Sequence, residues 1–482
     1  MTPLNLAEIA AITGGQVHDA DPGLVVEGAA FLDSRRPEPG GLFVAFAGEH
    51  VDGHDYTATA VGGGATAVLG SRPTGVPAVV VPDARTALQD LARAVLDRLR
   101  QAVPGPTVVA LTGSQGKTST KDLLARVLGD RAPTVATHGS FNNELGLPLT
   151  VLRATAETRF LVLEMGARGI GHLRELCQVA RPDISLVLNV GKAHLGEFGT
   201  RENIALAKGE LVEALPARGT AVLNLDDPLV AAMASRTEAR VTGFGQGQDA
   251  DLRYSEITVD DLGRPAFVLQ HRDETQRVAL QLLGRHQAVN AAAAAATAVA
   301  AGLPLAGAAA SLREVSSLSP MRMELHERVD GLVLVNDAYN ANPDSMRAAL
   351  ETLAAMGSRS GRRTVAVLGE MRELGTGSAE EHAAVGRLAA RLGIDLLVVV
   401  GKAARPLEAG YREVAAAASD DTPGQARWLG TVDEAVQWLR HNVSGSDLLL
   451  VKASRGARLE RVADELLDEG PGPVRDGKEA ST

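Results

Sequence analysis

The chain has 482 residues, a length that holds roughly two to four domains, and its 45% hydrophobic and 22% charged residues are typical of a globular protein. Lysine and arginine number 48 against 59 aspartate and glutamate, and the formal net charge of −11 disfavours a general nucleic-acid-binding function. The single cysteine, Cys177, excludes an internal disulfide and a cysteine-based zinc site, and it suits a reducing compartment.

The N-terminal segment 1–15 lacks the basic start and the unbroken apolar core of a signal peptide. No apolar run reaches the roughly 18 residues that span a membrane. The alanine-rich stretch 291–301 comes closest, but it is short and weakly apolar. We therefore expect a soluble, cytoplasmic protein that does not insert into a membrane.

Residues 1–104 are predicted to form a small α/β domain. Residues 86–100 have helical spacing of their leucines, valines and alanines. The prolines and glycine at 103–106 interrupt this pattern and indicate a linker. Short apolar runs predict strands at 28–32, 42–45, 66–69 and 78–81.

From residue 107 the pattern changes to strands that alternate with helices, which predicts a central domain over 105–318. Dense apolar runs are typical of strands buried on both faces of a mostly parallel sheet. Residues 239–283 alternate more and are predicted to be rich in β-structure. The strands are expected at 107–111, 160–163, 185–189 and 220–224, and the helices at 117–128 and 285–301.

The same alternation returns after a break near 316–320, and it predicts a Rossmann-like doubly wound domain over 319–470. The polar tail 471–482 is rich in glycine and charge and is expected to be disordered. Strands are predicted at 332–336, 363–368, 396–400 and 447–451, and helices at 343–355, 379–392, 432–440 and 459–467.

A glycine-rich loop between a predicted strand and helix is the sharpest motif. Glycines let backbone N–H groups converge on phosphate oxygens, and the following helix N-terminus adds partial positive charge. The usual pattern has a further glycine where Leu111 stands, so this loop is a shortened variant. We predict nucleotide binding by Gly113, Ser114, Gln115, Gly116, Lys117, Thr118 and Ser119, with Lys117 on the phosphates and Thr118 on Mg²⁺.

Further polar residues follow predicted strands, where open α/β sheets place ligands. Glu164 closes the strand 160–163 and suits Mg²⁺, although it also suits a cap or a surface position. His194 follows the strand 185–189, but a lone histidine is more often structural. Lys208 by itself is interpreted as a solvated helix lysine.

Two segments near helix starts carry unusual numbers of polar residues. Asn290 lies four residues after His286 and therefore on the same helix face. The segment 336–345, NDAYNANPDS, joins a strand to a helix, and its side chains either cap the helix or bind a ligand.

Taken together, these segments resemble the Mur ligase family, the ATP-dependent amide-forming enzymes of peptidoglycan precursor synthesis. The resemblance covers nearly the whole chain, and its parts keep the family's order. They are DSRRPEPGGLFVAFAGEHVDGHDY (33–56), TGSQGKTS (112–119), NNELGLPLT (142–150), LEMGA (163–167), NVGKAHLGEFG (189–199), AKGEL (207–211), LNLDDP (223–228), GRHQAVN (284–290), SPMRME (319–324) and NDAYNANPDSM (336–346).

Within the family, the segments at 142–150 and 336–346 are similar to the member that adds D-alanyl-D-alanine to UDP-N-acetylmuramoyl tripeptide. The ligase that adds the third residue usually carries an Asn-Pro-Arg triplet, which this chain lacks. The alternatives are that related ligase, a folate-type polyglutamate ligase, or a nucleotide-dependent switch that forms no bond. The resemblance implies an acyl-phosphate intermediate, ATP and Mg²⁺ as cofactors, and a monomer.

The resemblance also implies roles for individual residues. Thr118, Glu164 and His194 match magnesium ligands, and Lys208 matches a lysine whose carbamate supports a second Mg²⁺. Lys117, Lys208 and His194 are then the catalytic residues. For ATP, Asn290 matches an adenine contact, Arg322 an interdomain contact and Asp337 a ribose contact. The substrate contacts implied are Ser34 and Arg35 for the uridine nucleotide, and Asn142, Asn143, Tyr339, Asn340, Asn342, Ser345, Ser454 and Arg455, with Ala453 departing from the family's glycine.

Overall fold

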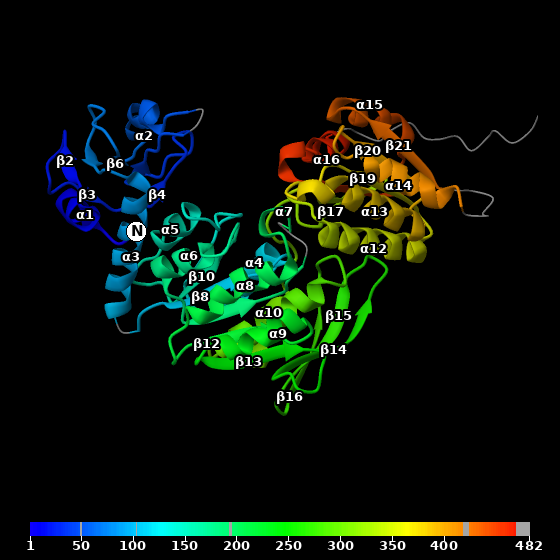
Figure 1. Ribbon diagram of the computed structural model, residues 1–482, viewed down its shortest axis with the longest axis horizontal. Coiled ribbons are helices and arrows are strands. Elements are labelled where there is room, and N and C mark those ends of the chain that lie inside the picture. The colour runs from blue at the N-terminus through cyan, green and yellow to red at the C-terminus, as the bar shows by residue number, and fades with distance from the viewer. Residues whose placement is uncertain (49–50, 103, 192–194, 418–423, 469–482) are drawn as a thin grey trace, which may run out of the picture.

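Three α/β units follow one another along the chain, each built on its own sheet (Figure 1). The blue N-terminal unit and the yellow-to-red C-terminal unit stand on either side of the green central one. None of the described helices is long and apolar enough to cross a membrane. The computed structural model describes residues 1–48, 51–102, 104–191, 195–417 and 424–468, so the tail predicted to be disordered lies outside the described residues.

The N-terminal unit holds a five-stranded sheet in the order β2-β7-β6-β5-β4, and only β2 is antiparallel to its neighbour. A two-stranded pair, β1 with β3, lies beside it. The strands are β1 (Leu4–Asn5), β2 (Gln16–His18), β3 (Val25–Val26), β4 (Ala30–Phe31), β5 (Leu42–Val44), β6 (Ala67–Gly70) and β7 (Ala78–Val80). The helices are α1 (Leu6–Thr13), η1 (Gly53–Tyr56), α2 (Thr57–Gly62) and α3 (Ala84–Gln101).

Helix α3 joins the N-terminal and central units. Asp83 caps its start by accepting a hydrogen bond from the Arg85 N–H at 2.9 Å. Its buried residues recur every three or four positions, including Leu88, Leu91 and Val95. This helix packs against α1 and also against α5 and α6 of the central unit. Burying each leucine contributes roughly 1.5–3 kcal/mol of stability. The helix therefore stabilises the packing of the two units against each other.

The central unit is a nine-stranded sheet in the order β16-β15-β14-β13-β12-β11-β8-β10-β9, in which β15 alone runs antiparallel to its neighbours, β14 and β16. The interior strand β8 sends Val108 and Ala110 into one core and Val109 and Leu111 into the other, as the continuous apolar run predicts. The strands are β8 (Thr107–Thr112), β9 (Thr134–Ala136), β10 (Phe160–Glu164), β11 (Ile184–Val187), β12 (Thr220–Asn224), β13 (Arg240–Gly245), β14 (Leu252–Val259), β15 (Pro265–His271) and β16 (Glu274–Ala279).

Helices cover both faces of the central sheet. One core contains α4, α10 and α11, and the other contains α6 and α8. The alanines of α10 up to Ala298 are fully buried, and their small side chains let this helix approach α4 closely. The helices are α4 (Lys117–Gly129), α5 (Gly146–Val151), α6 (His172–Ala180), α7 (Leu195–Phe198), α8 (Arg201–Glu213), α9 (Pro228–Ala231), η2 (Ala232–Arg236), α10 (Gln287–Ala300) and α11 (Leu305–Arg313).

The C-terminal unit is a six-stranded sheet in the order β17-β18-β22-β19-β20-β21, parallel except for β17. Helices α12, α13 and α14 fill one core and α15 and α16 the other, which confirms the doubly wound fold. The elements are β17 (Glu324–Glu327), β18 (Val333–Asp337), α12 (Pro343–Ser360), β19 (Arg363–Leu368), η3 (Gly375–Gly377), α13 (Ser378–Arg391), β20 (Leu396–Val400), α14 (Pro406–Ala415), β21 (Gln425–Leu429), α15 (Val432–Asn442), β22 (Asp447–Lys452), η4 (Arg455–Ala457) and α16 (Glu460–Leu467).

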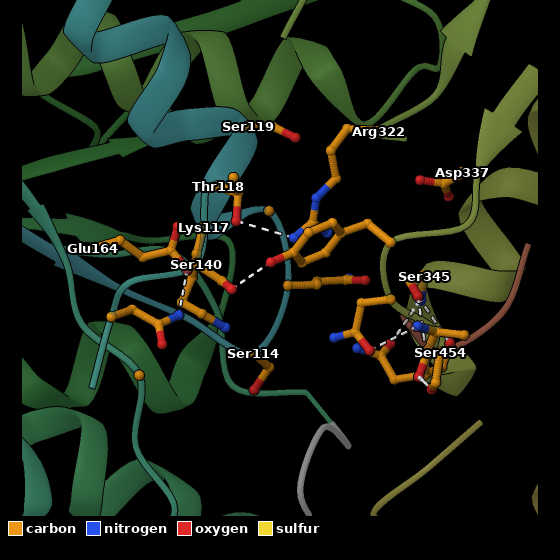
Figure 2. A pocket seen from close by; sticks show the side chains of 18 of the residues that line it. Ser114, Lys117, Thr118, Ser119, Ser140, Glu164, Arg322, Asp337, Ser345 and Ser454 are labelled. Atoms are coloured by element: carbon orange, nitrogen blue, oxygen red, sulfur yellow. Dashed lines mark hydrogen bonds between the residues drawn. The ribbon is translucent and has the colours of Figure 1, made fainter. Parts of the chain in front are cut away.

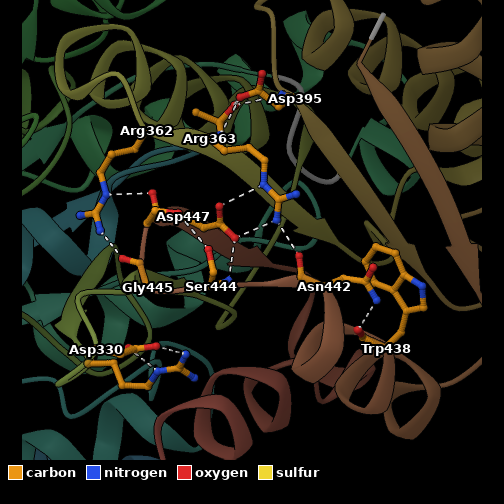
Figure 3. Close-up of polar contacts among 12 residues, drawn as sticks. Asp330, Arg362, Arg363, Asp395, Trp438, Asn442, Ser444, Gly445 and Asp447 are labelled. Carbon is orange, nitrogen blue, oxygen red and sulfur yellow. Dashed lines mark hydrogen bonds and ion pairs between the residues drawn. The ribbon is translucent and has the colours of Figure 1, made fainter. Parts of the chain in front are cut away.

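A closed polar network ties together the amino ends of the strands in this C-terminal sheet (Figure 3). Arg363 pairs with both carboxylate oxygens of the buried Asp447, at 3.0 and 2.7 Å, and donates to the Asn442 carbonyl at 2.6 Å. Asp395 accepts hydrogen bonds from the backbone N–H and the hydroxyl of Thr364, both at 2.7 Å. Because these polar groups satisfy one another's hydrogen-bonding capacity, we assign this end of the sheet a role in stability and not in ligand binding.

The predicted α/β class is confirmed, and the predicted strands that form sheet interiors are found within two residues of their expected bounds. The predictions missed β1, β2, β3, β9, β17 and β21, each of which pairs on one side only. Edge strands pair on one side only and are short or polar, so a search for apolar runs passes over them. The domain boundaries near residues 104 and 318 stay predictions.

Candidate active site

A cleft of about 600 Å³ lies between the central and C-terminal units. Its central wall comes from the loop between β8 and α4, the residues after β10 and β11, and the start of α10. Its C-terminal wall comes from the loops that follow β18, β19 and β22. Figure 2 shows Lys117, Thr118 and Glu164 facing Asp337 and Ser454 across this space. Both walls are built from the carboxyl ends of parallel strands, where such sheets bind ligands.

The phosphate-binding loop is held in place by Asn189, which follows β11. The Asn189 Oδ1 accepts hydrogen bonds from the backbone N–H groups of Ser114 and Gln115, both at 3.0 Å, and its Nδ2 donates to the Gln115 carbonyl at 3.1 Å. Sequence reasoning missed this residue, although it ends the strand predicted at 185–189. Of the residues predicted to bind the nucleotide, 114–119 line the cleft, whereas Gly113 does not.

Gly116 is required by the backbone and by a close neighbour. Its φ is +78°, and a Cβ added there would lie 2.5 Å from Asn290 Oδ1. The structure therefore brings Asn290, at the start of α10, directly against the phosphate loop. Asn290 also donates from its Nδ2 to Gln287 Oε1 at 2.9 Å.

Lys117 lies at the start of α4, and its Nζ donates to the Gly113 carbonyl at 2.8 Å. Burial lowers the pKa of Lys117, whereas the nearby Glu164 raises it and Arg322 lowers it further. An anion entering the cleft would favour the charged form of this amino group. The geometry therefore suits a phosphate group above the loop.

Glu164 ends β10 and is almost fully buried. Its Oε1 accepts a hydrogen bond from Asn142 Nδ2 at 2.7 Å, while its buried Oε2 has no partner among the described residues. An ionised oxygen without a partner is costly unless a cation binds it. Oxygen ligands of this kind fit Mg²⁺, which keeps several waters and nucleotide oxygens in its coordination shell. Such a site therefore does not need a cluster of three acidic, histidine or cysteine residues, and the described part of the chain has none.

Lys208 lies on α8 and is buried, so its interpretation as a solvated helix lysine is wrong. Burial lowers its pKa well below the usual value, and the nearby Lys117 lowers it further. Both effects shift the protonation equilibrium of this side chain toward the uncharged amine. Lys208 is not among the residues that line the cleft. His194, the third predicted catalytic residue, lies outside the described residues.

Arg322 bridges the two walls. Its guanidinium donates to Thr118 Oγ1 at 3.1 Å and lies 4.3 Å from the centre of the Tyr339 ring (Figure 2). The Tyr339 hydroxyl in turn hydrogen-bonds Ser140 of the central unit. Ser140 was not predicted, and nothing in its sequence context distinguishes it from an ordinary loop serine.

Asp337 ends β18 and forms a buried ion pair with Lys452 at the end of β22. Lys452 Nζ donates to Asp337 Oδ2 at 2.6 Å and to the Asn340 carbonyl at 2.8 Å. Asp337 Oδ1 accepts from the Met323 N–H at 3.2 Å. Burial lowers the pKa of Lys452, and Asp337 opposes that shift. Lys452 was missed as a site residue, although the strand predicted at 447–451 stops directly before it.

Other predicted substrate contacts line the cleft but are already hydrogen-bonded within the protein. Asn342 and Ser345 form a reciprocal capping box at the start of α12, with Ser345 N–H donating to Asn342 Oδ1 at 2.9 Å. The Asn143 Oδ1 accepts from the Gly146 N–H at 2.9 Å at the start of α5. Ser454 Oγ accepts from the Arg372 N–H at 3.0 Å. The exposed Arg455 pairs with Glu460 at 3.0 Å.

Ser34 and Arg35 lie in a turn of the N-terminal unit, and neither lines the cleft. The exposed Arg35 guanidinium pairs with Asp33 through two bonds of 2.9 Å and holds the pKa of Asp33 at about 2. Any ligand that contacts both this turn and the phosphate loop must extend from one unit to the next.

Models of known protein families match three parts of the chain. The sequence model described as Mur ligase middle domain matches residues 111–298, and the one described as Mur ligase, glutamate ligase domain, matches 321–455. A third, described as Mur ligase family, catalytic domain, matches 29–99. The chain belongs to the Mur ligase family. The cleft lies between the parts matched by the first two descriptions.

Curated Mur ligases match along nearly the whole chain. The UDP-N-acetylmuramoyl-tripeptide--D-alanyl-D-alanine ligase of Mycobacterium tuberculosis (strain ATCC 25618 / H37Rv) is 44% identical over 98% of this chain and 100% of that protein. The ligase of the same name from Escherichia coli (strain K12) is 35% identical over 98% and 100% of the two chains. These two relatives, which carry the same name, therefore align with this Mur ligase over nearly its whole length.

Solved structures of Mur ligases agree with the fold. A crystal structure of MurF from Acinetobacter baumannii is 30% identical, has a TM-score of 0.84, and covers 97% of this chain and 100% of that one. The MurF ligase of Thermotoga maritima in complex with ADP is 29% identical, with a TM-score of 0.76 and coverage of 92% and 97%. The roles that the family resemblance implies for single residues stay predictions.

Proposed function

We propose that this Mur ligase adds D-alanyl-D-alanine to UDP-N-acetylmuramoyl tripeptide at the expense of ATP, giving the pentapeptide precursor of peptidoglycan. The observation that carries this proposal is the cleft in which the phosphate-binding loop faces the carboxyl ends of a Rossmann-like sheet. The full-length relatives that bear the name of this activity support the choice of substrates.

The reaction joins a carboxylate to an amine, and a carboxylate must first be activated. The tripeptide carboxylate attacks the γ-phosphorus of ATP, the bond to the β-phosphate oxygen breaks, and an acyl phosphate and ADP form. The dipeptide amine then attacks the acyl carbon, and inorganic phosphate leaves. The Lys117 ammonium neutralises charge on the transferring phosphoryl group in the first step. Holding the reactants in line can supply roughly 7–11 kcal/mol of the barrier.

Mg²⁺ would be held by Thr118 and Glu164, and it neutralises nucleotide charge when bound. The buried, unpartnered Glu164 Oε2 supports this assignment. We also assign a carbamate to Lys208, because the uncharged amine that burial favours is the form that reacts with carbon dioxide. The carbamate would turn a buried base into an anion that can support a second Mg²⁺.

The remaining predicted contacts divide between the two substrates. Asn290, Arg322 and Asp337 are proposed to hold ATP, since they line the same cleft as the phosphate loop. Ser34 and Arg35 are proposed to bind the uridine nucleotide, so that the peptide extends from their turn to the cleft. We propose that the enzyme acts in the cytoplasm, where ATP is available, and as a monomer, as the family resemblance implies.

The test is ATP-derived phosphate release with UDP-N-acetylmuramoyl tripeptide, measured with and without D-alanyl-D-alanine. Sustained release that needs both substrates, with the mass of the pentapeptide product, is the expected result. Release with a single amino acid in place of the dipeptide would assign the chain to a neighbouring ligase. ATP binding without substrate-dependent release would instead favour a nucleotide switch.

A further inference from the structure

The segment that follows β10, residues 165–171, forms part of the central wall and is held by hydrogen bonds. The Gly166 N–H donates to the Asn142 carbonyl at 2.8 Å. The Arg168 N–H donates to Nδ1 of His172, the first residue of α6, at 3.3 Å. These bonds fix the backbone from which the Arg168 side chain extends, and Arg168 lines the cleft.

Arg168 stands at the side of the cleft that faces the N-terminal unit. Its hydrogen-bond partner His172 has its Nε2 3.4 Å from Glu144 Oε2. The Glu144 carbonyl accepts a hydrogen bond from Gln89 Nε2 at 3.3 Å. Gln89 belongs to α3, the helix that joins the N-terminal and central units and packs against α6. The central wall therefore continues from the phosphate loop, through Arg168, toward the unit that carries the turn at Ser34.

The other lysines and arginines of the described cleft lining already have partners within the protein. The pairs are Lys117 with the Gly113 carbonyl, Arg322 with Thr118, Arg372 with Glu370, Lys452 with Asp337, and Arg455 with Glu460. In contrast, the Arg168 guanidinium is exposed and has no hydrogen bond or ion pair with any described residue. Among the cations of the described lining, it is therefore the one that a ligand can bind without displacing a protein partner.

A tripeptide substrate can carry carboxylates besides the one that reacts. The name of a solved Mur ligase from Acinetobacter baumannii gives its peptide as alanyl-D-glutamyl-2,6-diaminopimelate. Glutamate and diaminopimelate have two carboxyl groups each. In such a peptide one glutamate carboxyl forms the link to diaminopimelate, and one diaminopimelate carboxyl is consumed when a further residue is added. Two carboxylates therefore stay free and, with pKa values near 4, stay charged at neutral pH.

An arginine in this position suits such a carboxylate. Its planar guanidinium presents N–H donors in a fork that matches the two oxygens of a carboxylate. The proposed substrate is held by its uridine nucleotide at Ser34 and Arg35 and reacts above the phosphate loop. Its peptide therefore passes the side of the cleft on which Arg168 stands. A positive charge without a protein partner on that path attracts a carboxylate that the reaction leaves untouched.

We propose that Arg168 binds a carboxylate of the tripeptide that does not react, an assignment that rests on the proposed function. The contact forms no covalent bond, and it holds the peptide so that the reacting carboxyl lies above the phosphate loop. The carboxylate is either the free one of glutamate or the far one of diaminopimelate. In the second case Arg168 also selects a tripeptide that ends in diaminopimelate over one that ends in lysine, which lacks that carboxyl group.

Substitution of Arg168 tests the contact through the steady-state kinetics of the three substrates. With the UDP-N-acetylmuramoyl tripeptide that ends in diaminopimelate, Arg168→Gln should lower kcat/KM about tenfold, mainly through a higher KM for the tripeptide. The KM values for ATP and D-alanyl-D-alanine should stay within about twofold of the wild type. Arg168→Lys keeps the charge without the fork, so its loss should be smaller, about threefold.

Arg218→Gln is the matched control. Arg218 is exposed, lies outside the described cleft lining and, like Arg168, has no hydrogen bond or ion pair with a described residue. This variant should have wild-type kinetics with all three substrates. Thermal unfolding should show that every variant is as stable as the wild type, because neither exposed guanidinium has a protein partner to lose.

Two altered tripeptides identify the carboxylate that Arg168 binds. A tripeptide with lysine as its third residue lacks the far carboxyl of diaminopimelate, and one in which the free glutamate carboxyl is converted to an amide lacks the other. The wild type and Arg168→Gln should use the tripeptide that lacks the bound carboxylate with equal kcat/KM. The tripeptide that keeps this carboxylate should show the full loss in Arg168→Gln.

A wild-type kcat/KM of Arg168→Gln with the diaminopimelate tripeptide would overturn the assignment. A loss of the same size with both altered tripeptides would also overturn it, because neither carboxylate would then be the partner of Arg168. So would a loss that appears only as a higher KM for ATP. If the wild type forms no amide with any of the tripeptides, the proposed function fails, independently of Arg168.

Discussion

The two walls of the cleft use their polar side chains differently. On the central wall, Glu164 leaves an oxygen without a described partner, and among the described residues Lys117 donates a hydrogen bond to the Gly113 carbonyl of its own loop. On the C-terminal wall, Asp337 is paired with Lys452, and Asn342 and Ser345 cap α12. The central wall therefore holds groups that a ligand can satisfy, whereas much of the C-terminal wall is already satisfied.

A segment rich in polar residues can therefore either bind a ligand or fix the local backbone. The segment 336–345 is as rich in hydrogen-bonding residues as the phosphate loop, yet most of its side chains fix the shape of the wall. We expect substitutions on the central wall to change chemistry and those in the capping box to change stability. The following predictions run from the largest expected effect to the smallest.

Lys117→Ala should abolish ligation, with kcat lowered at least about 10³-fold, or roughly 4 kcal/mol of transition-state stabilisation. The reason is that its ammonium is placed against the phosphate loop at the cleft. Phosphate release measures the effect, and thermal unfolding checks that the chain is folded. Lys402→Ala, at an exposed position, is the control. Near-normal turnover of Lys117→Ala would contradict the proposal that side chains of the central wall take part in the reaction.

Lys208→Ala should lower kcat about 10²–10³-fold, since it removes the site of the proposed carbamate and a metal-supporting anion. A short carboxylic acid added to this variant should restore part of the activity by occupying the vacated space. Lys208→Met keeps the apolar volume of the side chain and should be stable but inactive. Wild-type activity in Lys208→Met would show that the lysine only packs.

His286 makes stability depend on pH. Burial lowers its pKa in the folded chain to about 4, so the unfolded chain binds more protons between pH 6.5 and 4, and stability falls as pH drops through this window. Because the ring is partly exposed, we expect a loss of about 1–2 kcal/mol. Urea unfolding should show this loss to be smaller in His286→Gln than in wild type. The exposed His441→Gln serves as the control, and equal losses in all three would refute the prediction.

Asn342→Ala should lower the free energy of unfolding by about 1 kcal/mol, because it removes the cap of α12. The KM values for ATP and the dipeptide should change less than about threefold. Ser345→Ala, which breaks the other half of the same capping box, should behave alike. A tenfold rise in KM with unchanged stability would instead support direct substrate contact, as the family resemblance implies.

Much of the fold could be predicted because buried parallel strands require continuous apolar runs, and those runs are visible in the chain. The strand at 107–111 and the helix at 117–128 were therefore found together with the phosphate loop between them. Edge strands such as β17 and β21 carry no such signal. The capping box of α12 was anticipated as one of two alternatives, and the structure shows that this geometry is present.

The sequence by itself determined the α/β class, the phosphate loop and the resemblance to a ligase family, because these depend on local spacing and residue type. Only the tertiary structure decided which polar residues meet and which are already satisfied. The tertiary structure shows that Lys208 is buried and that Lys452 pairs with Asp337. The reason is physical: burial and pairing depend on neighbours that lie far apart in the chain, and no local pattern encodes them.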